Sequence, residues 1–341
     1  MSPKKKILYC VLNWGLGHAT RSEELIRNLK QENELVLASD GIAKVYLQKA
    51  FPDLEVLEMP SYNIRYAKSV WGTRFKLFFQ AISKIPLLFK EKNWVKRVCK
   101  QKNIDLIYSD GRFACYHENI PSIYITHQLN LKSGIAWGDK ILSRLHGILI
   151  SNYSEIHIPD YEDDEFSLAG ELSRKPSFKI PPIKYIGPLS RYNNIVGEEG
   201  NYILFICSGP EPQRTILEDG FWEVAEKLDG VECIIIRGSN SSKQLNSGHI
   251  KSIDLSFGEE LGKLIANAKL VVCRSGYSSV MDLHMLKKEN VIWIPTPGQG
   301  EQEYLAKFLR KKKWGMCISQ VEFWKVKLKK DIDLCLRSKI I

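Results

Sequence analysis

Short apolar runs alternate with longer amphipathic stretches along most of the chain. In the first half, the runs that predict buried strands are Ile7–Leu12, Glu34–Ala38, Leu54–Met59, Leu106–Tyr108, Ser122–Thr126 and Ile156–Ile158. Helical patterns, such as the one over Ala19–Lys30, lie between several of them. Short buried strands separated by helices indicate a parallel sheet with crossover helices.

The same alternation restarts near residue 202, after a segment rich in Pro, Gly and polar residues. It predicts strands at Tyr202–Cys207, Cys233–Arg237, Leu270–Cys273 and Val291–Ile294, and helices at Thr215–Leu228, Glu259–Ala266, Ser278–Lys287 and Glu303–Leu309. We therefore predict an α/β protein with an N-terminal Rossmann-like domain over 1–180, a linker over 181–200 and a second Rossmann-like domain over 201–320. An apolar stripe after Val321 predicts an amphipathic helix over 321–341.

Composition agrees with two globular domains. The 341 residues leave room for about two domains, and a hydrophobic content of 44% excludes wholesale disorder. No run approaches the roughly 18 apolar residues of a membrane-spanning helix. The eight cysteines are scattered without a CxxC pair, which favours reduced core thiols in a cytoplasmic protein.

The net charge of +10 is concentrated in residues 64–100, which hold ten Lys/Arg against the single acid Glu91. Basic residues alternate there with bulky apolar ones, and Pro86 is expected to kink or divide the helix. Three interpretations remain open: an interfacial helix on anionic lipid, a core helix with a lysine-rich solvent face, or a nucleic-acid surface without a known reader motif. We favour the membrane and expect no nucleic-acid partner; the residues expected to face the membrane are Trp71, Arg74, Lys76, Phe78, Phe79 and Lys84.

The first candidate site follows the first predicted strand, where residues 13–21 read N-W-G-L-G-H-A-T-R. Glycines and a helix N-terminus favour close approach of an anionic ligand. The third glycine of the dinucleotide fingerprint is replaced, which disfavours a nicotinamide dehydrogenase. His18 is a candidate general base, although a histidine near a helix start is often a capping or packing residue.

Three polar loops follow predicted strands of the second half, where open α/β sheets bind ligands. The loop over 208–215 offers a glycine turn and Arg214 for a phosphate, or is an ordinary turn. The segment 273–282 ends in Asp282, a candidate ligand for ribose hydroxyls or a surface aspartate. The loop over 295–303 is rich in Gln and Glu, which could bind sugar hydroxyls or cap the helix. Carboxylate motifs are poor, so we predict no metal and no cofactor.

These motifs together resemble the GT-B glycosyltransferases, in particular the MurG-type N-acetylglucosaminyltransferases of glycosyltransferase family 28. Residues 15–18 with Arg21 look like the family's N-terminal glycine loop, and residues 126–130 (T-H-Q-L-N) are similar to its His-Glu-Gln-Asn stretch. Ser208 with Gly209, the Arg-Ser-Gly turn over 274–276 and residues 299–302 resemble its donor-side motifs. The chain departs from the family at Asp282, where a glutamate is usual, and in the two prolines within 208–215.

The resemblance implies two domains facing each other across a cleft and an inverting, metal-independent transfer of a sugar from a UDP-sugar. It assigns catalysis to His18 and the acceptor side to Gly15, Gly17, Arg21, Asp110, His127 and Asn130. It assigns the donor to Ser208, Gly209, Arg214, Arg274, Ser275, Gly276, Asp282, Gln299, Glu301 and Gln302. The sugar expected is GlcNAc and the acceptor a lipid-linked or cell-envelope glycan, used by a cytoplasmic enzyme peripheral to the inner face of the membrane. The alternatives are a nucleotide-sugar epimerase of the same fold and a non-catalytic, membrane-docked scaffold for a partner glycosyltransferase.

Overall fold

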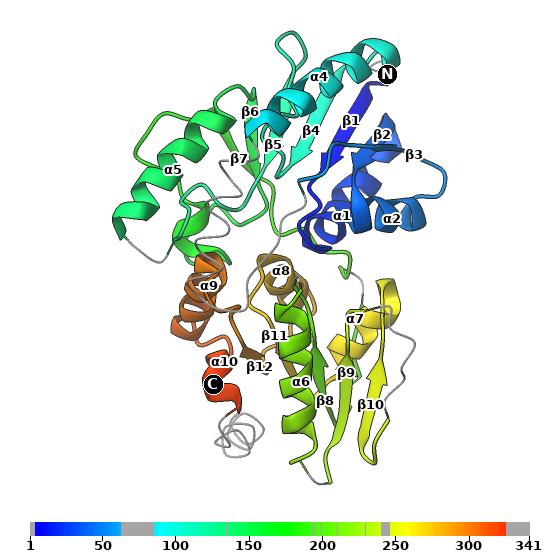
Figure 1. Cartoon of the computed structure of the whole chain (residues 1–341), viewed down its shortest axis with the longest axis vertical. Helices are drawn as coiled ribbons and strands as arrows, with labels where there is room; N and C mark the ends of the chain where they lie inside the picture. The colour runs from blue at the N-terminus through cyan, green and yellow to red at the C-terminus, as the bar shows by residue number, and fades with distance from the viewer. Residues whose placement is uncertain are drawn as a thin grey trace. The chain divides into compact units, whose positions relative to one another are not determined.

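The computed structural model describes residues 4–62, 85–133, 136–193, 195–198, 200–209, 211–228, 230–239 and 246–324. The described residues form two compact units, and the chain passes from the first to the second between Arg191 and Tyr192. Each unit is built on its own parallel sheet (Figure 1). The predicted α/β fold is therefore confirmed.

The first unit contains a seven-stranded sheet in the order β3-β2-β1-β4-β5-β6-β7. The strands are β1 (Lys6–Val11), β2 (Glu34–Ser39), β3 (Glu55–Glu58), β4 (Leu106–Asp110), β5 (Ser122–Ile125), β6 (Glu155–Ile158) and β7 (Ile183–Tyr185). All neighbours pair in parallel, and β1 lies between β2 and β4. The strand order reverses beside β1, which makes the carboxyl end of β1 the place where such sheets bind ligands.

Helices cover both faces of this sheet, because alternate side chains of a strand point to opposite faces. The helices are α1 (Gly17–Glu32), α2 (Gly41–Ala50), α4 (Ile85–Lys102) and α5 (Ala136–Ile150), with a short 3-10 turn η1 (Gly170–Ser173). Tyr9 of β1 lies in the core formed with α1 and α2. Its neighbour Cys10 lies in the opposite core, formed with α4.

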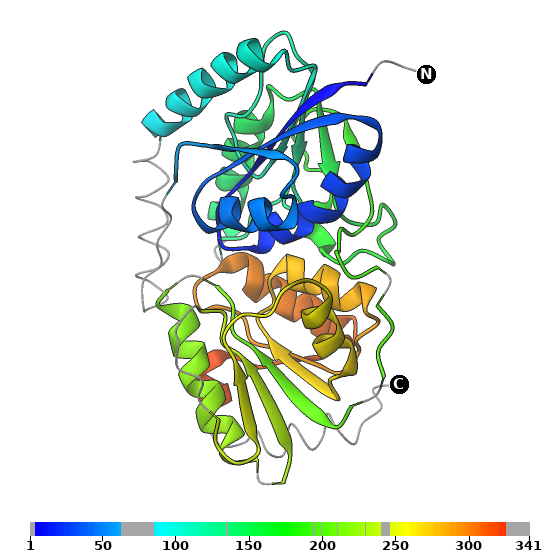
Figure 2. The ribbon, with the colours of Figure 1, turned by 90° about the vertical axis from the view of Figure 1, so that its right-hand side faces the viewer.

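The second unit contains a six-stranded parallel sheet in the order β10-β9-β8-β11-β12-β13. Its strands are β8 (Tyr202–Ile206), β9 (Glu232–Ile236), β10 (Ile250–Ile253), β11 (Leu270–Cys273), β12 (Val291–Trp293) and β13 (Met316–Cys317). Its helices are α6 (Gln213–Ala225), α7 (Gly258–Asn267), α8 (Tyr277–Met285), α9 (Gly300–Lys311) and α10 (Gln320–Trp324). Figure 2 shows α6 along one face of this sheet, where Phe221 packs against Phe205 and Phe323.

One predicted boundary was wrong. Ile183–Tyr185, placed in the linker, pairs with β6 as the last strand of the first sheet. Residues 63–84, just before Pro86, lie outside the described residues, so the kink or division expected at Pro86 stays a prediction; Pro86 itself is the second residue of α4. The predicted C-terminal helix and the start of the basic segment fall largely outside the described residues, although α10 covers 320–324. No helix in the described part of the chain has the length and apolarity needed to span a membrane.

Candidate active site

The carboxyl ends of β1 and β4 bring the first glycine loop and Asp110 together. Val11, the last residue of β1, is the register partner of Asp110, the last residue of β4. The chain leaves β1 through the loop containing Gly15, which has a φ of +72°, and enters α1 at Gly17. The first turns of α1 therefore stand beside Asp110.

Asp110 is fully buried and accepts hydrogen bonds from three side chains of α1. His18 Nδ1 lies 2.7 Å from Oδ1, and Arg21 Nε lies 2.9 Å from Oδ2. Ser22 donates its hydroxyl to Oδ2 at 2.8 Å, and a second Arg21 nitrogen contacts Oδ1. Burial alone would raise the pKa of Asp110, but the positive charge of Arg21 and the hydrogen bonds from Arg21 and His18 hold it well below its usual range. Asp110 is thus a carboxylate near pH 7 and can only accept hydrogen bonds.

The charge state of Asp110 determines the tautomer of His18. Because the carboxylate accepts, His18 Nδ1 carries the proton between them, and the lone pair of Nε2 is left available. Burial and the positive charge of Arg21 lower the pKa of His18, and Asp110 offsets only part of that effect. His18 is therefore neutral near pH 7, with its side chain one-fifth exposed. This arrangement suits a general base.

His127 joins the cluster, whereas Asn130 does not. Arg21 Nη1 lies 3.1 Å from the buried His127 Nδ1, so one guanidinium contacts His18, Asp110 and His127. The Asn130 amide instead donates to the carbonyls of Glu171 and Arg174, at 2.7 and 2.8 Å. Asn130 thereby fixes the turn around η1.

A second buried network beside this cluster was missed by the sequence analysis. Arg112 lies 2.5 Å from Asp40 Oδ1 and 2.8 Å from Glu91 Oε1, and all three side chains are buried. Asn13 of the glycine loop donates to Asp40 Oδ2 at 3.2 Å. The signal was present, because Asp40 follows β2 directly, much as Asp110 ends β4.

In the second unit, Arg274 is a buried cation at the carboxyl end of β11. Within the described part of the chain, its guanidinium contacts backbone carbonyls alone, those of Ile294 at 3.3 Å, Pro295 at 3.2 Å and Gln213 at 3.2 Å. Among the described residues, no carboxylate forms an ion pair with it. Burial lowers its pKa to about 10, so it keeps its charge near pH 7. A buried, uncompensated cation favours an anionic ligand.

Hydrogen bonds connect the turns after β11 and β12, which contain several residues predicted to bind the donor. The Ser275 hydroxyl donates to the Gln302 carbonyl at 2.8 Å, and Thr296 N donates to Gln302 Oε1 at 2.9 Å. Gly276 and Gln299 cap the N-termini of α8 and α9, whose first turns follow directly. The half-buried Asp282 lies further along α8, and Glu301 lies in the first turn of α9.

Arg214, expected at a phosphate, is already paired. Its guanidinium contacts Glu211 and Glu218, each at 2.6 Å. Glu218 also contacts Arg237, which pairs with Asp254 at 2.8 Å as well. Ser208 and Gly209 occupy the turn after β8, where Gly209 has a φ of +100°.

The predictions for a membrane-facing surface and for metal binding concern other parts of the chain. The six residues predicted to face the membrane, between Trp71 and Lys84, lie outside the described residues. Within the described ranges, no group of three or more His, Cys, Asp or Glu could hold a metal ion.

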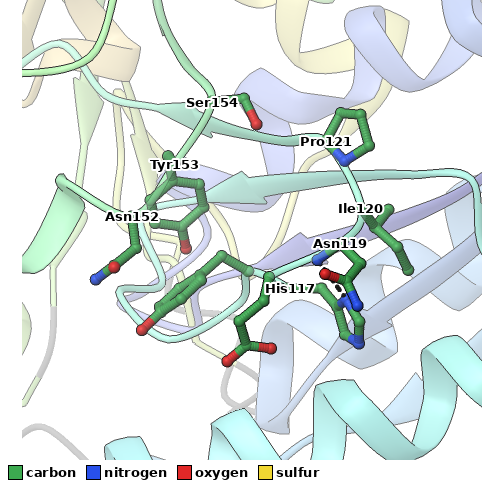
Figure 3. Close-up of a pocket in the computed structure, with 9 residues that line it drawn as sticks. His117, Asn119, Ile120, Pro121, Asn152, Tyr153 and Ser154 are labelled. Atoms are coloured by element: carbon green, nitrogen blue, oxygen red, sulfur yellow. Dashed lines mark hydrogen bonds between the residues drawn. The ribbon is translucent and has the colours of Figure 1, made fainter.

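A pocket at the other end of the first sheet contains none of the expected site residues. It is lined by residues 116–121 and 152–154, next to Ser122, where β5 begins (Figure 3). The Lys92 ammonium lies 3.1 Å from the ring centroid of Tyr116 at its rim.

Two families match parts of this chain. Residues 213–339 match the glycosyltransferase family 28 C-terminal domain, and residues 5–133 match glycosyl transferase family 1. A UDP-N-acetylglucosamine--N-acetylmuramyl-(pentapeptide) pyrophosphoryl-undecaprenol N-acetylglucosamine transferase of Clostridium perfringens is 24% identical over 325 residues, which cover 90% of this chain and 83% of the relative.

Solved structures share the fold at low identity. MurG of Acinetobacter baumannii is 12% identical, with a TM-score of 0.54 over 98% of this chain and 94% of that chain. The glycotransferase of kitacinnamycin is 11% identical, with a TM-score of 0.70 over 98% and 92%. The spinosyn rhamnosyltransferase SpnG, complexed with thymidine diphosphate, is 14% identical, with a TM-score of 0.62 over 97% and 93%.

The two parallel α/β units and these matches define the chain as a glycosyltransferase of the GT-B fold. Within that class it is MurG-like, as the sequence motifs predicted.

Proposed function

We propose that this glycosyltransferase moves GlcNAc from UDP-GlcNAc to a lipid-linked or cell-envelope glycan acceptor, with inversion and without a metal ion. The observation that carries the proposal is the hydrogen bond between His18 Nδ1 and Asp110, which directs the free Nε2 lone pair away from the carboxylate.

The chemistry follows from that tautomer. The acceptor hydroxyl oxygen attacks the anomeric carbon of the donor sugar while His18 Nε2 takes the hydroxyl proton. The bond between the anomeric carbon and the diphosphate oxygen breaks, and UDP leaves with the electron pair. Asp110 stabilises the imidazolium that forms, because its negative charge lies 2.7 Å from Nδ1. A single displacement of this kind inverts the anomeric centre.

We assign the donor diphosphate to the second unit. Arg274 supplies a buried positive charge, and the N-termini of α8 and α9 add the partial positive charge of a helix start. These groups would stabilise the charge that develops on the leaving group, which is the task of a divalent cation in metal-dependent transferases. The donor named for the Clostridium relative, UDP-N-acetylglucosamine, supports UDP-GlcNAc as the first candidate.

Two observations support a lipid-linked acceptor: the acceptor for which a relative is named, and the positive charge of one segment of the chain. The curated relative is named for a pyrophosphoryl-undecaprenol acceptor, and residues 64–100 of this chain carry nine net positive charges with many apolar side chains. Such a composition suits contact with an anionic membrane surface. We accordingly place the enzyme at the inner face of the cytoplasmic membrane.

The test is an assay of the purified chain in EDTA, with labelled UDP-GlcNAc and a lipid-linked acceptor analogue. We expect labelled lipid product, with kcat reduced about 100-fold or more in His18→Ala and UDP affinity nearly unchanged. The anomeric configuration of the product tests inversion. Conversion of UDP-GlcNAc to an isomer without acceptor would instead identify an epimerase, and unchanged turnover in His18→Ala would remove His18 from the role of base.

A further inference from the structure

Asn13 stands at the start of the glycine loop that connects β1 to α1. Just before it, Leu12 N donates to the carbonyl of Asp110 at 3.0 Å, which holds the end of β1 against β4. At the other end of the loop, Leu16, the N-cap residue of α1, packs partly against the core formed with α2. The residues between are half-buried or exposed, and a Cβ added to Gly15 would meet no atom within 4 Å. Asn13 is thus well placed to fix the position of the loop.

The side chain of Asn13 contacts the segment that connects the neighbouring strand β2 to α2, the helix beside α1 (Figure 1). Its amide nitrogen donates to Asp40 Oδ2 at 3.2 Å, and its amide oxygen accepts from Ala43 N, in the first turn of α2, at 3.4 Å. The packing is close, since a Cβ added to Gly41, which has a φ of +53°, would come within 2.3 Å of Asn13 Nδ2. The amide therefore serves as donor and acceptor at once, which an ionised carboxylate cannot do.

Asp40 is a fixed partner for Asn13, because buried residues hold it in turn. Its other oxygen, Oδ1, lies 2.5 Å from an Arg112 nitrogen, and both side chains are buried. Arg112 also contacts Glu91 Oε1 at 2.8 Å, and Tyr62 donates to Glu91 Oε2 at 2.6 Å. The Asp40 carboxylate cannot turn away from the glycine loop without weakening its pairing with a buried cation.

The loop that Asn13 holds leads directly to the candidate base. His18 is the second residue of α1, and its Nδ1 lies 2.7 Å from Asp110 at the end of β4. Two carboxylates therefore locate this end of the helix: Asp110 contacts His18 itself, and Asp40 contacts the loop that precedes it. Small displacements of a catalytic group carry large rate penalties. A shift of the loop at Asn13 would move the imidazole relative to an acceptor hydroxyl.

We propose that Asn13 is a positioning residue for sugar transfer: its side chain holds the glycine loop against Asp40 and thereby sets the start of α1 and the place of His18. The inference rests on the proposed function, in which His18 takes the proton of the acceptor hydroxyl. Asn13 itself neither gives nor takes a proton in the reaction.

Asn13→Asp tests the contact with the smallest change in shape. At low pH the carboxyl groups at positions 13 and 40 share one proton, and the hydrogen bond between them is kept. At higher pH both are ionised and repel each other, and Arg112 cannot separate them because it lies at the far oxygen of Asp40. We expect kcat to fall with rising pH in this variant, to at least about tenfold below the unmodified chain. The substrates are saturating UDP-GlcNAc and a short-chain prenyl diphosphate that carries one N-acetylhexosamine.

Two further variants isolate the position of the charge. Asn33→Asp makes the same charge change at the other end of α1, where the half-buried Asn33 donates to the Leu29 carbonyl at 3.0 Å. Its pH profile should follow that of the unmodified chain. Asn13→Asp/Asp40→Asn exchanges the two groups, so that the new amide accepts from Arg112 and donates to position 13. This double variant should recover most of the kcat that Asn13→Asp loses at high pH.

Nuclear magnetic resonance of the imidazole of His18, assigned with His18→Ala, reports its position without turnover. We expect the Nδ1–H signal of His18 to change with pH in Asn13→Asp over the range in which kcat falls, and to stay unchanged there in Asn33→Asp. If Asn13→Asp keeps the pH dependence of the unmodified chain in both measurements, the proposal is wrong. Failure of the double variant to recover kcat would also overturn it.

Urea denaturation at both ends of the pH range shows whether each variant is folded. Unfolding of Asn13→Asp at the higher pH would make the contact structural and overturn its role in positioning. Absence of transfer by the unmodified chain would overturn the proposed function, whereas the resonance of His18 would still test the position of the loop.

Discussion

Gly111 lies directly against the imidazole of His18. It follows the end of β4 with a φ of +77°, and a Cβ added to it would come within 2.7 Å of His18 Cε1. The backbone that carries Asp110 therefore also limits the position of the ring that Asp110 orients.

Gly111→Ala should displace His18 and lower kcat about 10- to 100-fold, because small displacements of a catalytic group carry large rate penalties. Gly187→Ala is the control. Gly187 has nearly the same φ, +74°, but nothing lies within 4 Å of an added Cβ. Both changes should cost about 1–2 kcal/mol of unfolding free energy from backbone strain. Equal kcat values for the two variants, measured with saturating donor and acceptor, would contradict the role of Gly111.

The acid limb of the pH profile should report His18. Burial and Arg21 lower the pKa of His18, so the base is deprotonated above a midpoint lying below 6.5. We expect kcat/KM to rise with pH through that midpoint and then level off. Asp110 raises the pKa of His18, so Asp110→Asn should move the midpoint to lower pH while reducing the plateau about 100-fold. A midpoint that moves upward, or an acid limb that persists in His18→Ala, would assign the limb to another group.

Much of the fold could be predicted from sequence because the buried strands are continuous apolar runs. The strands that were missed are short or lie in polar surroundings. Ile183–Tyr185 follows two prolines and gains its partner only from β6, and Met316–Cys317 has two residues. Such strands form because a neighbouring strand supplies their hydrogen bonds, which local pattern does not show.

The site was partly predictable for a similar reason. The glycine loop predicted the position of His18. The pairing of Arg214 with Glu211 and Glu218 is local in sequence and was missed, whereas the pairing of Glu218 with Arg237, which follows strand β9, depends on the fold. No local motif records that pairing.

Arg112→Met should destabilise the first unit strongly. Arg112 is fully buried between Asp40 and Glu91, so its removal leaves two buried carboxylates without a counter-charge. We expect a loss of about 3–5 kcal/mol of unfolding free energy. Lys102→Met, which breaks the exposed pair with Glu55, should cost about 1 kcal/mol or less. Urea denaturation of both variants measures the difference, and similar losses would show that the buried network contributes little.

The two arginines of the second unit should differ in their effect on the donor. The partners of Arg274 among the described residues are carbonyls, whereas the charge of Arg214 is compensated by Glu211 and Glu218. Arg274→Met should therefore weaken UDP binding by about 10- to 100-fold, the loss expected for a hydrogen bond to a charged group. Arg214→Met should change UDP affinity far less, because Glu218 keeps Arg237 as a partner.

Calorimetric titration with UDP in EDTA measures both affinities, and circular dichroism checks that each variant is folded. Methionine is a suitable replacement for Arg274, because it fills the buried space of the arginine while removing a cation whose desolvation is unfavourable. The fold of that variant should consequently survive. If Arg214→Met weakened UDP binding more than Arg274→Met, the diphosphate would lie by the turn after β8, with Arg214 exchanging its carboxylates for the ligand.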